Sequence, residues 1–201
     1  MKRVFIAVPC MDTVPVEFAQ SFATMDKPEN CIVSFLKGSL IYDSRNQLCK
    51  QALECKADYI MWMDSDMVFP KDTLTAMLEH MEDKDIVSGI YFKRVYPFSP
   101  VIYETLFEEG KATDYLDYPE RSVFQAEGFG FGCVMMKTTV LIDMLLNEGQ
   151  WFTPINNFGE DLSFMWRAKK LGYKAYVDSN IRCGHIGHIM VSEDTYKATK
   201  G

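Results

Sequence analysis

Two aspartates stand two positions apart at the end of a short apolar segment. Asp64 and Asp66 flank Ser65 and follow the run Tyr59–Met63, which we expect to be a buried strand. Side chains two residues apart in an extended chain point the same way, so both carboxylates converge on one spot. At the carboxyl end of a parallel strand, where open α/β sheets bind ligands, such paired oxygens suit Mg²⁺ or Mn²⁺ bridging to phosphates.

The D-x-D spacing alone is weak evidence, because Asp83 and Asp85 repeat it. That second pair lies in a polar turn before the next apolar run, and we interpret it as a solvated loop. Motif matches of this length are expected to include false positives. The placement after a buried strand is what favours metal or phosphate binding by Asp64 and Asp66.

The ends of two other predicted strands add candidates. Pro9 follows Val8 at the end of the first strand, where a proline stops the hydrogen-bonding ladder. Arg45 opens the helix after the second strand, where its guanidinium could meet a diphosphate at the helix N-terminus. A surface ion pair between Arg45 and Asp43 is the alternative interpretation.

Two of the three histidines lie close together in the late segment 182–188. Gly184 and Gly187 flank them and favour a tight loop that presents the imidazole of His185 or His188 at close range. A zinc site that includes Cys183 is another interpretation, but no convincing fourth ligand stands nearby.

Glu160 and Asp161 open a further predicted helix. Acidic residues in a first turn stabilise the helix dipole, which is a purely structural role. The functional alternative makes Asp161 a general base that deprotonates a hydroxyl group.

The elements that would position these groups alternate through the first half of the chain. Short apolar runs predict strands at 4–8, 31–36, 59–63 and 86–91. Helical patterns run from after Val14 to Met25, from a cap at Asp43 or Ser44 to about Lys56, and from Pro70 to Met81. This alternation is typical of an α/β fold with a parallel sheet and crossover helices.

The second half of the chain is less regular. Strands are expected at 101–105, 131–136 and 174–177, the first two separated by an acidic, aromatic loop. Helices are expected from Thr138 through 146 and over 160–171, the latter ending at Gly172. After Met190 the chain is polar, and we expect it to fray.

Composition sets limits on the partners. The chain has 201 residues, a formal net charge of −7, and 48% hydrophobic residues, which fits one globular domain and excludes global disorder. The acidic balance argues against nucleic acid, which needs clustered Lys and Arg. No apolar run suits a signal peptide or a transmembrane segment, so we expect a soluble protein, at most peripheral to a membrane. The six cysteines, without a C-x-x-C pair, are expected to be reduced thiols in the cytoplasm.

Taken in order along residues 4–188, these motifs resemble a family-2-type glycosyltransferase with the GT-A nucleotide-diphospho-sugar transferase fold. The resemblance rests on Val8-Pro9, on the helix start 43–46 with Ser44 in place of the usual Ala, and on Asp64-Ser65-Asp66. It continues through the strand at 87–94, the glycine loop and strand at 128–137, the "ED" helix start at 160–161, and Cys183-Gly184-His185. It implies a single domain with a mostly parallel central sheet flanked by helices and a smaller acceptor-side sheet.

The resemblance also implies a role for each candidate. Val8 and Pro9 would border the nucleoside pocket, and Arg45 and Ser65 would help to hold the nucleotide. Asp66 and His185 would be the protein's metal ligands, with His188 as the competing candidate. Asp64 would face the ribose or a metal-bound water. Asp161 would be the catalytic base, and the acceptor side would include Gly130, Trp151 and Glu160.

The implied activity is a metal-dependent, hexosyltransferase-like transfer from a nucleotide-sugar, UDP-linked by expectation, to a glycan, protein or small-molecule hydroxyl, with inversion. A histidine ligand favours Mn²⁺ over Mg²⁺. Residues 1–94 would form the nucleotide-binding half, 95–190 the acceptor half, and 191–201 a polar tail. A sugar nucleotidyltransferase and a non-catalytic nucleotide-sugar-binding module are the alternatives.

Overall fold

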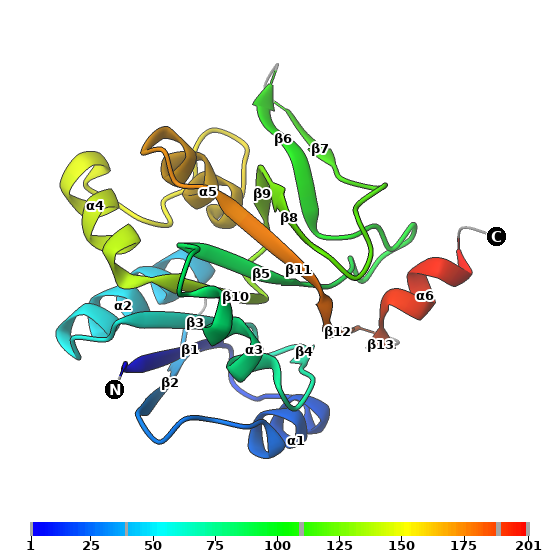
Figure 1. The fold of residues 1–201 in the computed structure, drawn as a ribbon, viewed down its shortest axis with the longest axis horizontal. Helices are drawn as coiled ribbons and strands as arrows, with labels where there is room; N and C mark the ends of the chain where they lie inside the picture. The colour runs from blue at the N-terminus through cyan, green and yellow to red at the C-terminus, as the bar shows by residue number, and fades with distance from the viewer. Residues whose placement is uncertain (1, 39, 109–110, 188–189, 200–201) are drawn as a thin grey trace.

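The computed structural model describes residues 2–38, 40–108, 111–187 and 190–199, which fold around a seven-stranded sheet of order β2-β1-β3-β10-β5-β11-β8 (Figure 1). Its strands are β1 (Val4–Cys10), β2 (Cys31–Lys37), β3 (Tyr59–Met63), β5 (Ile86–Ile90), β8 (Val123–Ala126), β10 (Cys133–Lys137) and β11 (Ala175–Arg182). The pairs β1–β2, β1–β3 and β5–β11 are parallel, whereas β10 and β8 run antiparallel to their neighbours. The prediction of a mostly parallel α/β sheet is confirmed.

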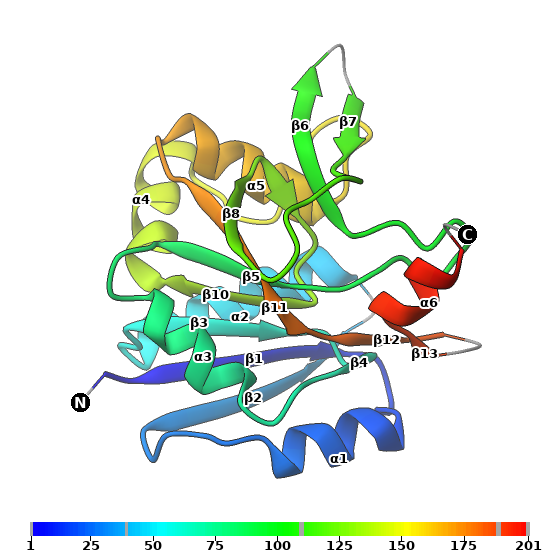
Figure 2. The same ribbon diagram turned by 45° about the vertical axis from the view of Figure 1, so that its right-hand side comes forward.

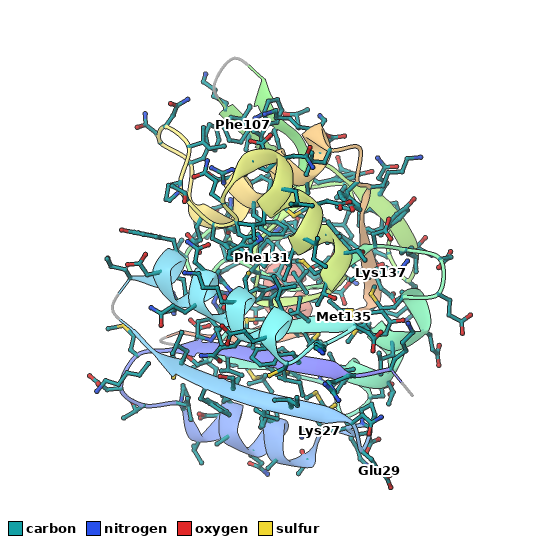
Figure 3. The ribbon with its side chains drawn as sticks, turned by 90° about the vertical axis from the view of Figure 1, so that its left-hand side faces the viewer. Lys27, Glu29, Phe107, Phe131, Met135 and Lys137 are labelled. Atoms are coloured by element: carbon teal, nitrogen blue, oxygen red, sulfur yellow. The ribbon has the colours of Figure 1, made fainter. Side chains whose placement is uncertain are left out.

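Helices cover both faces of this sheet, which is why its inner strands are apolar on both sides. The helices are α1 (Val16–Thr24), α2 (Ile41–Glu54), α3 (Thr73–His80), α4 (Thr138–Glu148) and α5 (Glu160–Lys170). Along β1, Phe5 and Ala7 pack with α2 and α4, whereas Val4 and Ile6 pack with α1 and α3. Figure 2 shows α1 beneath the sheet, and Figure 3 shows α2 and α4 covering the face whose core contains Phe131.

Two three-stranded sheets complete the fold. One has the order β13-β12-β4 and consists of β4 (Met67–Val68), β12 (Gly184–Ile186) and β13 (Met190–Val191). The other has the order β7-β6-β9 and consists of β6 (Ile102–Glu108), β7 (Lys111–Asp114) and β9 (Gly128–Phe129). In Figure 1 the β6–β7 pair projects away from the central sheet.

The structure corrects several predicted elements. Antiparallel β10 lies between β3 and β5, so the third and fourth strands of the first half are not neighbours. The segment expected to be a loop between 105 and 131 contains β7, β8 and β9, and β11 extends to Arg182. Helix α2 begins at Ile41, and neither Asp43 nor Ser44 caps it.

The end of the chain also differs from the prediction. Instead of fraying after Met190, the chain forms β13 and the helix α6 (Glu193–Ala198), which begins with a capping box of Ser192 and Thr195. Tyr196 is buried and stacks on Phe92 with ring centroids 4.8 Å apart. Across the described segments, the helices are too short or too polar to cross a membrane.

Candidate functional site

A cavity of about 280 Å³ lies at the carboxyl ends of β1 and β3, the edge at which an open α/β sheet binds ligands. The turn after β3, the start of α2 and the start of α5 each contribute polar groups to its wall. The lining residues are Pro9, Cys10, Met11, Gly38, Ile41, Ser44, Arg45, Asp64, Ser65, Asp66, Tyr91, Phe131, Glu160 and Asp161. Seven of the residues predicted from the sequence are therefore brought together.

Arg45 lies beneath the cavity and joins two of its carboxylates. Its Nη2 donates to Asp64 Oδ1 at 2.9 Å and Oδ2 at 3.2 Å, and its Nε donates to Glu160 Oε1 at 3.3 Å. Arg45 is only 2% exposed. The interpretation of Arg45 as a surface residue paired with Asp43 is therefore wrong.

The surroundings of Arg45 explain how the chain tolerates a buried charge. The rings of Trp62, Phe131 and Phe152 lie with centroids 5.5–5.7 Å from its Cζ. Burial acts to lower the pKa of Arg45, but Asp64 and Glu160 outweigh it and raise the pKa. Burial also raises the pKa of Asp64, against the opposing effect of Arg45. Removing either partner of such a pair would leave an uncompensated buried charge.

Asp66 and His185 face each other at the edge of the same cavity. His185 Nε2 lies 3.6 Å from Asp66 Oδ2, and His185 Nδ1 bonds the backbone oxygen of Phe92 at 2.7 Å. A neutral imidazole that donates from Nδ1 carries its lone pair on Nε2. An imidazole lone pair and a carboxylate oxygen then point at one spot.

Short strands hold this pair in place. Gly184 pairs with Val68 and His185 with Met67, where β12 meets β4, and the Ile186 N–H donates to Asp66 O at 2.7 Å. In Figure 2, β12 lies close to β4 at the carboxyl end of β1. The D-x-D turn and the histidine are thus tied together through the backbone.

Asp66 also has a cationic partner, Arg94, whose Nη1 lies 2.8 Å from Asp66 Oδ2. Burial acts to raise the pKa of Asp66, but His185 and Arg94 outweigh it and hold the pKa below its ordinary value. Arg94 was not predicted from the sequence as a contact of the site. Arg94 belongs to the segment 87–94, which resembles a strand of the glycosyltransferase family, and this resemblance was the sequence feature that could have identified Arg94.

Asp161 stands in the first turn of α5. Its Oδ1 accepts a hydrogen bond of 2.7 Å from its neighbour's backbone, the Leu162 N–H. Burial, followed by the adjacent charge of Glu160, raises the pKa of Asp161 to about 6. An acidic side chain with a raised pKa in a cavity has the properties of a general base.

Tyr91 links the glycine loop to the histidine, and it too was missed. Its Oη accepts from the Gly132 N–H at 3.1 Å, and its ring stands edge-on to His185 at 5.5 Å. A Cβ on Gly130 would lie 2.2 Å from Tyr91 Oη and 3.4 Å from Asp161 Oδ2. Glycine is therefore required at 130 for the loop to approach Tyr91.

The other predicted site residues are not among those that line the cavity, although Gly130 and His185 adjoin lining residues. Val8 is fully buried in the core below it. Trp151 lies by a separate surface depression with Lys50 and Leu145, and its Nε1 donates to Leu141 O at 2.8 Å. His188 lies outside the described residues.

The single domain, with a large mixed sheet flanked by helices and two smaller sheets, is consistent with a GT-A-like fold. Residues 15–141 match the family model for glycosyl transferase family 2. Because this match covers more than half of the chain, the protein belongs to that family and is a glycosyltransferase, as the sequence motifs predicted.

Comparison of structures agrees with the fold. The chain is similar to the crystal structure of A197 from STIV, with a TM-score of 0.67 and 19% sequence identity. The match covers 97% of this chain and 92% of the A197 chain. At this identity the similarity shows the fold alone. A search of curated proteins found no significant match.

Proposed function

We propose that the protein transfers a sugar from a UDP-linked donor to an acceptor hydroxyl, with a divalent cation and with inversion at the anomeric carbon. The observation that carries this proposal is the approach of Asp66 and His185 to 3.6 Å at the edge of a cavity that also contains Asp161.

The donor atoms fit a divalent cation. A carboxylate oxygen and an imidazole nitrogen suit Mn²⁺ better than Mg²⁺, which prefers oxygen ligands alone. Within the described ranges, no cluster of three or more His, Cys, Asp or Glu side chains is arranged to hold a metal. Asp66 and His185 would therefore be two ligands, completed by the donor's phosphate oxygens and by water, with Asp64 acting through a water. Bound there, the cation would stabilise the charge that develops on the leaving diphosphate.

Asp161 supplies the proton chemistry in this proposal. The acceptor oxygen attacks the anomeric carbon, the bond from that carbon to the diphosphate oxygen breaks, and Asp161 takes the hydroxyl proton. Asp64 and Glu160 are paired with Arg45, whereas Asp161 Oδ2 faces the Gly130 loop. A single displacement assisted by one base predicts inversion.

In this proposal the first part of the chain binds the nucleotide. The nucleotide would contact the lining residues before 95, which include Pro9, Arg45 and Ser65, and Val8 would support that wall of the cavity from the core. Gly130 and Glu160 would lie on the acceptor side. A cytoplasmic location is part of the same proposal, because all six cysteines are free thiols.

The test is a screen of UDP-sugars with and without Mn²⁺ that measures released UDP. We expect release with at least one donor, its loss on chelation, and its loss in Asp66→Ala. Asp83→Ala is the matched control, since Asp83 belongs to the other D-x-D pattern and is exposed. Normal turnover by Asp66→Ala, or equal loss in both variants, would reject the cation assignment.

A further inference from the structure

Arg94 contacts the proposed cation site but has no part in the mechanism above. It lies in the loop after β5, whose base is closed by the Phe92–Pro100 bridge and by a 2.9 Å bond from Lys93 N to Ser99 O. Its side chain is 49% exposed, and its Nη1 reaches Asp66 Oδ2 at 2.8 Å. A second contact, to the Ile186 backbone oxygen, is long at 3.5 Å.

The neighbouring cation has a different partner. Lys93 pairs with Asp114, which also accepts a hydrogen bond from Ser99, so Lys93 is held within its own loop and the β6–β7 sheet. Arg94 instead pairs with the carboxylate oxygen that faces His185 Nε2. A cation bound between Asp66 and His185 would compete with Arg94 for that oxygen.

Charge decides the outcome of this competition. A divalent cation and a guanidinium cannot both stay within bonding distance of one oxygen without strong repulsion. The exposed side chain of Arg94 is weakly anchored and is the partner that can move. The anion that a donor brings beside the cation is its diphosphate, for which arginine has matched, bidentate geometry.

The cavity itself provides little positive charge for that anion. Four carboxylates line it, from Asp64, Asp66, Glu160 and Asp161, against the guanidinium of Arg45. Arg45 is buried and already paired with two of them. A diphosphate bound at this edge would therefore need a positively charged side chain from outside the lining, and Arg94 lies next to Asp66 at the edge of the cavity.

We propose that Arg94 is a diphosphate-binding residue that forms an ion pair with Asp66 in the free enzyme and moves to the donor's diphosphate when the divalent cation binds. This inference rests on the proposed function. It predicts opposite effects of one substitution: loss of Arg94 strengthens binding of the cation alone and weakens binding of the nucleotide with the cation.

The experiment uses the full chain as wild type, Arg94→Gln and Arg3→Gln. Arg3 lies next to the amino end of β1, away from the cavity, so its variant controls for the change in net charge. Binding of Mn²⁺ alone is measured by electron paramagnetic resonance of the free ion. Binding of UDP at saturating Mn²⁺ is measured by calorimetry, and circular dichroism checks the fold.

For Arg94→Gln we expect Mn²⁺ alone to bind about two- to fivefold more tightly, the effect of losing a half-exposed ion pair. We expect UDP at saturating Mn²⁺ to bind at least about tenfold more weakly, the effect of losing a charged hydrogen bond. Arg3→Gln should match the wild type in both. Weaker Mn²⁺ binding by Arg94→Gln, or UDP binding within twofold of wild type, would overturn the inference alone. A wild type that does not bind UDP with Mn²⁺ would overturn the proposed function as well.

Discussion

Replacing Asp161 with Asn should make the protein more stable and inactive at the same time. Burial and the charge of Glu160 raise the pKa of Asp161 from 3.8 to about 6, so the folded state disfavours the ionised carboxylate. A group whose folded pKa is raised contributes stability below its unfolded pKa and loses that contribution as the pH rises through the folded pKa. At neutral pH, the ionised carboxylate of Asp161 therefore lowers the free energy of unfolding of the wild type.

The magnitude follows from the size of the shift. At 1.36 kcal/mol per pKa unit, a shift from 3.8 to about 6 corresponds to about 3 kcal/mol when the carboxylate is fully ionised. Asn can still accept the hydrogen bond from Leu162 N but interacts less with the α5 dipole, so we expect a net gain of about 2–3 kcal/mol at pH 7.5. At pH 4, where Asp161 is mostly protonated in the folded state, the gain should shrink to about 0.5 kcal/mol.

Urea unfolding of wild type and Asp161→Asn at both pH values measures this difference. Glu17→Gln is a matched control, because Glu17 occupies the first turn of α1 and is exposed. Its effect should stay within about 0.5 kcal/mol at either pH. In parallel, transfer by Asp161→Asn should fall by about 10²–10⁴, whereas UDP affinity with Mn²⁺ stays within about threefold. A less stable variant at pH 7.5, or a gain that does not change with pH, would refute the reasoning.

Three further outcomes are expected. Because the proposed base must be ionised, wild-type kcat/KM for UDP release should rise with pH, reach half its maximum near pH 6 and level off about one pH unit higher, as measured from initial rates between pH 5 and 8. Arg45→Met should lower the free energy of unfolding by about 2–4 kcal/mol in urea, since Asp64 and Glu160 lose their shared partner; an unchanged value would argue against that network. Gly130→Ala should cost about 1–3 kcal/mol because its Cβ would meet Tyr91 Oη, and adding Tyr91→Phe should recover part of the loss, whereas no recovery would place the clash elsewhere.

The parts of the site that could be predicted are those encoded locally. The run Tyr59–Met63 has the length and apolar character of a buried strand, and the structure has β3 at those residues. The turn after it comes directly next in sequence, so Asp64 and Asp66 could be placed at a sheet edge without knowing the rest of the fold. The helix at Glu160 was found in the same way, from its acidic first turn and from Gly172 beyond its end.

The parts that could not be predicted depend on pairing between distant segments. β4 and β12, which bring Asp66 to His185, are too short to show any hydrophobic period. β10 is apolar on both faces, and a strand of that kind has the same pattern in either direction, so its antiparallel insertion left no signal. The burial of Arg45 was not predicted, because Phe131 and Phe152, two of the rings around it, come from the other half of the chain.

The buried position of Arg45 bears on the chemistry proposed for Asp161. Burial, Glu160 and Asp64 all act to raise the pKa of Asp161, whereas Arg45 acts to lower it. Without the guanidinium, the pKa would rise further, and less of the carboxylate would be ionised at neutral pH. Without burial, it would fall towards its ordinary value, and the carboxylate would be a weaker base. A general base is most effective when its pKa lies near the working pH. In the proposed mechanism, Arg45 therefore acts without touching the acceptor: burial makes the Asp161 carboxylate basic, and Arg45 keeps it ionised near neutral pH.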